Sequence, residues 1–185
     1  MPRLFVAIDL PDDLKQRIAR LQAEIPTARW VKPEHMHLTL RFIGDEVPTA
    51  KIAPINTALA AVEAAPFTLT IAGVGRFPPS LKKAPRVLWV GLEPQPALQA
   101  LHAQIEAALE GAGFAPEGRS YNPHITLARL NLHKPTPAAD AFLEEQASFN
   151  AGTFTAHQFT LYNSLLTPQG PRYTHEAIYP MKKDL

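Results

Sequence analysis

The sequence predicts an α+β fold of two pseudo-symmetric lobes, each a mainly antiparallel sheet with outer helices, around a central groove. Three observations predict it. Short β-branched and aromatic runs alternate with amphipathic helices, the order of these elements restarts near residue 86, and each half carries a strand with a His-x-Thr motif. A chain of 185 residues can form two small lobes that share one core. We therefore expect a single bilobal domain over 1–185, with an internal repeat of approximately 1–85 and 86–185.

Periodicity defines the expected elements. Leu14, Ile18, Leu21 and Ile25 recur at helical spacing, and Pro54 lies inside a second helical stripe, which it could bend. Helices are expected at 11–25, 48–65, 94–113 and 137–147. Strands are expected at 4–9, 36–44, 67–77, 86–92, 124–130, 153–166 and 172–180.

The repeat is visible in the order of the elements. "VAIDLPDDLKQRI" and "WVGLEPQPALQAL" share a strand, an acid, a proline and a helix at an offset of 84 residues. The His-x-Thr strands lie 87 residues apart, and each is followed by a helix and then by an "FTL" strand. Equivalent strands of such a repeat face each other across a groove, so we expect His37 and His124 to be neighbours.

Composition excludes several classes of protein. The chain has no cysteine, which excludes disulfides, thiolate metal sites and a cysteine nucleophile. The N-terminal apolar run is too short for a signal peptide or a membrane span. We therefore expect a cytoplasmic protein, not bound to membranes, and a monomer. A net charge of +1 favours a small or terminal phosphate ligand over a long duplex.

The two motifs, "HLTL" and "HITL", each place polar and apolar residues on opposite faces of a strand. Residues two apart share a face, so His37 and Thr39 point one way and the flanking aliphatic residues point the other. His124 and Thr126 repeat the arrangement. Either histidine alone fits a structural role, but the symmetric pair indicates a functional site.

Two histidines across a groove suit acid–base chemistry, since imidazole exists in both protonation states near neutral pH. The threonine hydroxyls could donate to the non-bridging oxygens of a phosphodiester. A metal site is the competing interpretation, but two histidines without a suitably spaced carboxylate are a thin ligand set. We expect neither a metal nor another cofactor.

At these residues the sequence resembles the two-histidine phosphoesterase superfamily, and more narrowly the RNA 2′,3′-cyclic phosphodiesterase family, also called 2′-5′ RNA ligases. The resemblance rests on "RLFVAIDLP", "RWVKPEHMHLTLRFIGD", "RVLWVGLE", "NPHITLARL" and "LYNSLLTPQGPRYTHEAIYPM". It implies a phosphoric diester hydrolase that opens RNA-terminal 2′,3′-cyclic phosphates to 2′-phosphates without a metal. It also implies reversible 2′-5′ ligation in some members. The expected ligands are RNA ends or nucleoside 2′,3′-cyclic phosphates.

The resemblance also implies roles for individual residues. His124 would activate water and His37 would protonate the leaving 3′ oxygen, with Thr39 and Thr126 on the phosphate. The family's extended second motif points to Arg129, but strict alternation puts this residue on the wrong face unless a bulge intervenes. Arg41 has the right parity without a bulge, so both arginines are candidate phosphate ligands.

Other residues have weaker claims, and two rival functions stay open. Basic residues of one loop could guide RNA, and two aromatic residues before the motif strands could stack on a base: Lys82, Lys83, Arg86, Trp30 and Tyr121. A sister enzyme with a small substrate, such as an ADP-ribose cyclic phosphate or a 2′-5′ oligonucleotide, would use the same chemistry. A non-catalytic RNA-end binder would keep the groove, although binding alone needs no proton-transfer pair.

Overall fold

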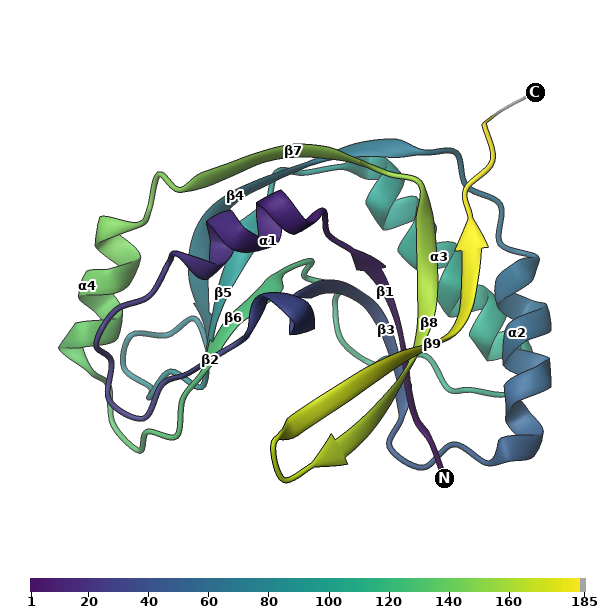
Figure 1. Cartoon of the computed structure of the whole chain (residues 1–185), viewed down its shortest axis with the longest axis horizontal. Helices are drawn as coiled ribbons and strands as arrows, with labels where there is room; N and C mark the ends of the chain where they lie inside the picture. Colours follow the sequence, from purple (N-terminus) through teal and green to yellow (C-terminus); the bar gives the residue numbers. More distant parts are fainter. Residues whose placement is uncertain (184–185) are drawn as a thin grey trace.

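One twisted sheet runs through the protein, with the helices packed against its outer side (Figure 1). The computed structural model describes residues 1–183. The strands are β1 (Arg3–Asp9), β2 (Arg29–Trp30), β3 (His37–Gly44), β4 (Phe67–Phe77), β5 (Val87–Leu92), β6 (Ile125–Arg129), β7 (Asn150–Ala156), β8 (Gln158–Thr167) and β9 (Gly170–Pro180). The helices are α1 (Asp12–Ala19), α2 (Ile52–Ala60), α3 (Pro96–Gly111) and α4 (Pro137–Glu145), with short 3-10 turns η1 (Pro33–His35) and η2 (Thr49–Lys51).

The strand order divides the sheet into two lobes. The order is β7-β4-β5-β6-β3-β1-β8-β9, with β2 paired to β6, and each pairing is antiparallel. At the centre, β3 and β6 share the single register pair Leu38–Ile125. We call β3, β1, β8 and β9 the first-motif lobe, and β6, β5, β4 and β7 the second-motif lobe. Their junction is the seam.

Each lobe draws on both halves of the sequence. β4 comes from the first half but pairs with β5 and β7, whereas β8 comes from the second half and pairs with β1. The helices cross as well, since α1 packs against β7 and α3 packs against α2 and β3. Figure 1 shows α1 and α4 over one lobe and α2 and α3 over the other. The expected repeat halves are therefore interleaved and do not coincide with the lobes.

Buried apolar side chains explain the helices, and each helix ends before its expected last residue. α1 ends at Ala19 instead of residue 25, because the chain turns tightly after Ile18 while Leu21 stays in the core. The expected bend at Pro54 is absent. Proline lies in the first turn of α2, where its missing N–H removes no helical hydrogen bond.

The expected strand 153–166 is two strands, which the sequence pattern did not reveal. β7 ends at Ala156 and β8 begins at Gln158, with His157 between them. The break has a topological cause, because β7 pairs with β4 in the second-motif lobe and β8 pairs with β1 in the first-motif lobe. The chain changes lobes at His157. Within residues 1–183 we find no helix with the length and apolar character that a membrane span requires.

Candidate active site

The seam brings the two His-x-Thr motifs onto one face of the sheet. Leu38 and Ile125 pair across it, and both are fully buried on the core side. Their sequence neighbours face the opposite way, toward the groove: His37, Thr39, His124 and Thr126. Each motif thus places one histidine and one threonine at the seam, on the strand face away from the core.

Both imidazoles are held by the same type of hydrogen bond. The Nδ1 of His37 lies 2.9 Å from the carbonyl oxygen of His35, and the Nδ1 of His124 lies 2.7 Å from that of Asn122. A carbonyl oxygen can only accept, so each Nδ1 carries the proton and donates it. The Nε2 atom of each ring is then the nitrogen left to exchange protons with a ligand.

Burial favours the neutral form of both rings. Desolvation lowers the pKa of His37 to about 4, against smaller opposing effects of the His35 hydrogen bond and of Asp9. Desolvation also lowers the pKa of His124, with a further contribution from Arg129. Aromatic neighbours supply much of the apolar surroundings, with Phe5 centred 4.8 Å from the His37 ring and Phe77 4.9 Å from the His124 ring. An anion bound between the rings would raise both pKa values.

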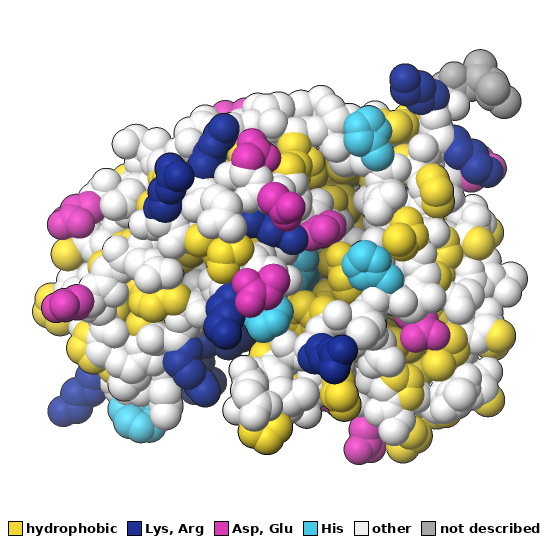
Figure 2. All heavy atoms as spheres, viewed as in Figure 1, with side chains coloured by type: hydrophobic (Ala, Val, Ile, Leu, Met, Phe, Trp, Pro, Cys, Tyr) yellow, Lys and Arg dark blue, Asp and Glu magenta, His cyan; other side chains and the backbone are white. Residues whose placement is uncertain are grey.

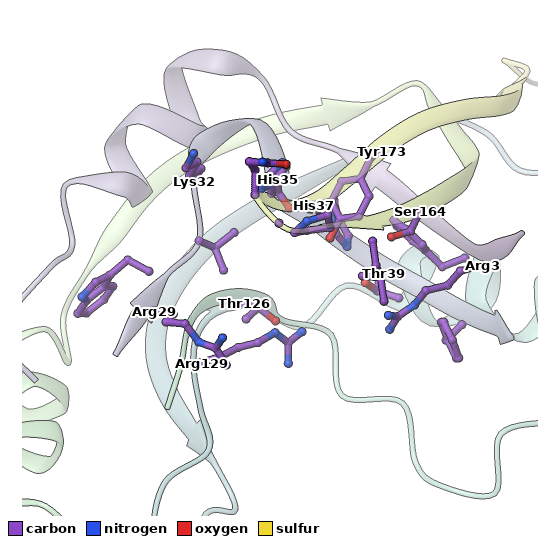
Figure 3. A pocket seen from close by; sticks show the side chains of 18 residues that line it. Arg3, Arg29, Lys32, His35, His37, Thr39, Thr126, Arg129, Ser164 and Tyr173 are labelled. Atoms are coloured by element: carbon purple, nitrogen blue, oxygen red, sulfur yellow. Dashed lines mark hydrogen bonds between the residues drawn. The ribbon is translucent and has the colours of Figure 1, made fainter. Parts of the chain in front are cut away.

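A β-bulge turns Arg129 toward the groove. The pairing of β5 with β6 passes from Leu88–Ala128 to Trp89–Thr126, which leaves Leu127 as an extra residue. Beyond the bulge the alternation is reversed, so Arg129 returns to the face of Thr126. Its side chain lines the groove (Figure 3). The bulge that the alternation argument required is thus present.

A matching bulge removes Arg41 from the groove, so the expected parity of Arg41 is wrong. The pairing of β1 with β3 passes from Val6–Arg41 to Ala7–Thr39 and leaves Leu40 unpaired. Arg41 consequently follows Leu40 into the core and is 5% exposed. Phe42 takes the groove position that Arg129 has in the other motif.

The buried guanidinium of Arg41 ties its strand to the segment that precedes His124. Nε lies 2.6 Å from Oε1 of Glu106, and Nη1 lies 3.6 Å from Oε1 of Glu117. Nη2 donates to the carbonyl oxygen of Ala115. Glu106 and Glu117 also approach His102 closely enough to form a ligand cluster for a metal ion, but Arg41 already supplies a cation to both carboxylates. We interpret this cluster as structural.

The groove contains a main cavity of about 640 Å³ with a strongly basic lining. Its lining residues include His37, both motif threonines and four cationic side chains, and none of them is Asp or Glu: Arg3, Arg29, Lys32 and Arg129 are the cations. Figure 2 shows the groove as a hollow in the middle of this face, with histidine and charged side chains at its rim. This local excess of positive charge contrasts with the +1 of the whole chain.

Two of these cations are direct neighbours. Arg29 of β2 pairs with Arg129 of β6, which puts like charges opposite each other on one face. Neither guanidinium forms a salt bridge to a residue in 1–183. Two adjacent, solvent-exposed guanidiniums without a carboxylate partner make a suitable site for an anionic ligand.

Several lining residues were not anticipated from the sequence. Ser164 and Tyr173 reach the main cavity from the hairpin of β8 and β9. Both lie in the segment "LYNSLLTPQGPRYTHEAIYPM", which carries the family resemblance, but neither residue was assigned a role from the sequence. Arg29 and Lys32 lie close to Trp30 in the "RWVKP" segment. Trp30, which was considered above as a stacking residue, also lines the main cavity, so this segment could have pointed to its two cationic neighbours. The loop residues Lys82, Lys83 and Arg86 line neither this cavity nor the one described next.

His124 opens into a second cavity, of about 350 Å³. This cavity is lined by aromatic, amide and aliphatic side chains, including Phe77, Trp89, Gln99 and Tyr121. The Tyr121 hydroxyl donates to the carbonyl oxygen of Thr39, which fixes this wall to the first motif strand. The two histidines therefore stand at the same seam but face different cavities.

These features define a class of protein, a two-lobed fold with paired histidines at the seam and a basic cavity of about 640 Å³, and comparison with known proteins agrees. The family model of the 2′-5′ RNA ligase superfamily matches residues 7–167. The structure is similar to the crystal structure of E. coli LigT complexed with 3′-AMP, with a TM-score of 0.80, 29% identity and coverage of 99% of this chain and 100% of that one. It is equally similar to TT0787 of Thermus thermophilus, with a TM-score of 0.80, 26% identity, and coverage of 99% and 100%.

Curated relatives are similar in sequence over nearly the whole chain. The RNA 2′,3′-cyclic phosphodiesterase of Archaeoglobus fulgidus is 33% identical over 180 residues, which cover 96% of this chain and 99% of that protein. The one of Geobacillus stearothermophilus is 34% identical over 96% of this chain, which spans 56% of that relative's length. The chain belongs to the 2′-5′ RNA ligase superfamily, so the expected family and fold class are confirmed.

Proposed function

We propose that the groove hydrolyses the 2′,3′-cyclic phosphate at an RNA end to a 2′-phosphate, with His37 and His124 as the acid–base pair. The observation that carries this is the seam, which sets two imidazoles on one face, each with Nδ1 bonded to a backbone carbonyl and Nε2 available. The relatives named as RNA 2′,3′-cyclic phosphodiesterases support the enzyme class expected from the sequence, a phosphoric diester hydrolase.

The two cavities support the order of proton transfer. The RNA strand that ends in the cyclic phosphate has further phosphates along its backbone. The main cavity contains the cations together with His37. The ribose of that strand therefore lies on the His37 side, where this imidazole, protonated, gives its proton to the leaving 3′ oxygen. His124, at the opposite side of the phosphorus, takes a proton from the attacking water.

Thr39, Thr126 and Arg129 are the proposed partners of the phosphate. They line the main cavity, and their donors can bind the equatorial oxygens whose charge grows in the transition state. The P–O3′ bond breaks as the water oxygen bonds to phosphorus, and one proton enters at His124 as another leaves at His37. Ring strain in the five-membered cyclic phosphate lowers the barrier, so these residues suffice without a metal ion.

The basic lining favours an RNA end over a small cyclic phosphate. Arg3 is already paired with Asp45 at 3.2 Å, but Arg29, Lys32 and Arg129 still exceed what one phosphate requires. An RNA end brings further phosphates to the same cavity. A mononucleotide 2′,3′-cyclic phosphate should therefore react with a higher KM than an oligonucleotide with the same end. Added salt should raise the KM strongly for the oligonucleotide only.

The test is hydrolysis of an RNA ending in a 2′,3′-cyclic phosphate by the purified protein in excess EDTA. We expect conversion to the 2′-phosphate at an undiminished rate. No conversion in EDTA together with recovery on adding a divalent cation would contradict the metal-free mechanism. Formation of the 3′-phosphate would contradict the proposed leaving group.

A further inference from the structure

An ion pair that the proposed mechanism does not use lies next to His37. β1 ends at Asp9, whose register partner in β3 is His37, so the two side chains are neighbours on the same face of the sheet. Oδ1 of Asp9 lies 2.7 Å from Nζ of Lys15 and accepts a hydrogen bond from the N–H of Leu10 at 2.9 Å. The carboxylate is therefore fixed beside the proposed acid.

Lys15 is a buried cation on an otherwise amphipathic helix. It lies in α1 and is 8% exposed, whereas Arg17 of the same helix has a half-exposed side chain. A buried ammonium group is unfavourable unless an anion compensates it, and within residues 1–183 Asp9 is the carboxylate that pairs with Lys15. α1 also packs against η1, whose His35 carbonyl orients the His37 ring. The pair thus joins this helix to the strand beside His37.

Titratable or charged side chains approach His37 from every element packed around it. They are Asp9 of β1, Lys15 of α1, His35 of η1, Arg129 of β6, Tyr162 of β8 and Tyr173 of β9. Burial has the largest effect and lowers the pKa of His37, while the His35 hydrogen bond and Asp9 raise it and Lys15 and Arg129 lower it. Asp9 is the only carboxylate in this set.

We infer that Asp9 and Lys15 are positioning residues for His37: the Asp9 carboxylate favours the imidazolium that gives its proton to O3′, and Lys15 holds this carboxylate and compensates part of its charge. The inference rests on the proposed function, which makes His37 the acid. Neither residue lines a cavity of the groove, so both act through the imidazole. An acid among aromatic rings needs such an anion, because burial alone favours its neutral form.

The two substitutions should act in opposite directions, which a purely structural ion pair would not do. Asp9→Asn removes the anion, so the alkaline limb of kcat should move to lower pH by at least about half a pH unit. Lys15→Met removes the compensating cation and leaves the half-exposed Asp9 charged, so the limb should move to higher pH by a similar amount. The double variant should return the limb close to its position in the unaltered protein.

The test is the pH profile of kcat for these three variants, with the same cyclic-phosphate RNA in EDTA. Asp13→Asn and Lys51→Met are the matched controls, since they make the same changes at exposed positions outside both cavities and neither charge acts on His37. Both controls should keep the alkaline limb in place. A lower kcat with an unmoved limb in Asp9→Asn and Lys15→Met would overturn the inference and leave the pair a structural role.

NMR titration of the His37 ring in the ligand-free protein is a second readout, which does not depend on hydrolysis. We expect the pKa of His37 to be higher in Lys15→Met and lower in Asp9→Asn than in the unaltered protein. If Lys15→Met does not fold, Asp9→Asn alone decides, because Asp9 is half exposed. Equal pKa values would overturn the inference and leave the proposed hydrolase intact. Absence of hydrolysis by the unaltered protein would instead overturn the proposed function.

Discussion

The two motif strands start from the same sequence pattern and differ after the fourth residue, which is Leu40 in β3 and Leu127 in β6. In both, the histidine Nδ1 bonds to a carbonyl two residues upstream, and a bulge follows at Leu40 in β3 and at Leu127 in β6. After the bulge, β3 has a buried Arg41 and a groove-facing Phe42. β6 has a buried Ala128 and a groove-facing Arg129.

The comparison separates the features that both strands have from those that only one strand has. What the strands share, the oriented imidazole and the threonine, is what proton transfer to and from one phosphate requires. What they do not share separates their roles. Arg129 presents a cation to the main cavity, where we propose that the phosphate binds, whereas Arg41 ties β3 to the segment before His124 on the core side. Each prediction below alters one side of this comparison and leaves the other intact.

The largest effect is expected at the shared residues. His37→Ala and His124→Ala should each lower kcat for cyclic-phosphate hydrolysis about 10²–10⁴-fold, because each removes a general acid or base. Circular dichroism should show a retained fold. His133→Ala, an exposed histidine outside both cavities, is the control and should be as active as the unaltered protein. Near-full activity in either motif variant would exclude the acid–base pair.

Substitutions of the two groove-facing residues after the bulges, Arg129 and Phe42, should lower kcat/KM to different extents. Arg129→Ala should lower kcat/KM about 10- to 100-fold, since it removes a charge-assisted donor, and Arg129→Lys should restore part of the loss. Phe42→Ala should cost less than tenfold. The exposed Arg119→Ala is the control for loss of charge. A larger loss in Phe42→Ala than in Arg129→Ala would reverse the comparison.

The pH dependence should show the coupling between the histidines and the bound phosphate. The base must be neutral, so activity falls as pH drops below its pKa, and the acid must be protonated, so activity falls as pH rises above its pKa. Burial lowers both pKa values in the free protein, to about 4 for His37. The bound anion raises them, so the alkaline limb of kcat should lie at least about one pH unit above that of kcat/KM. Coincident limbs would contradict this coupling.

The buried arginine should matter most for stability. Arg41→Met leaves Glu106 and Glu117 without their cation. We expect the free energy of unfolding to fall by roughly 2–3 kcal/mol, which is less than for a fully buried ion pair because both carboxylates are partly exposed. Urea denaturation measures it, with Arg119→Met as the control. KM should change little, since Arg41 does not reach the groove. A stable variant with a strongly raised KM would instead indicate a role in substrate binding.

The sequence predicted the elements and the histidine pair better than it predicted side-chain direction. His37 and His124 met at the seam because two strands with the same pattern paired through Leu38 and Ile125, which a repeat implies. Arg41 could not be placed from alternation, because a bulge reverses the alternation and leaves no mark in the residues around Leu40. The exchange of β4 and β8 between the lobes was also hidden, since a strand pattern does not specify its partner.

The central claim is that His37 and His124 act in one step on one phosphate. The most direct measurement compares kcat for the double variant His37→Ala/His124→Ala with kcat for each single variant, in EDTA and with the same cyclic-phosphate RNA. Residues that act as a unit are non-additive, so the account predicts a double variant about as slow as the slower single one. A loss equal to the product of the two single losses would contradict it, because the histidines would then act independently.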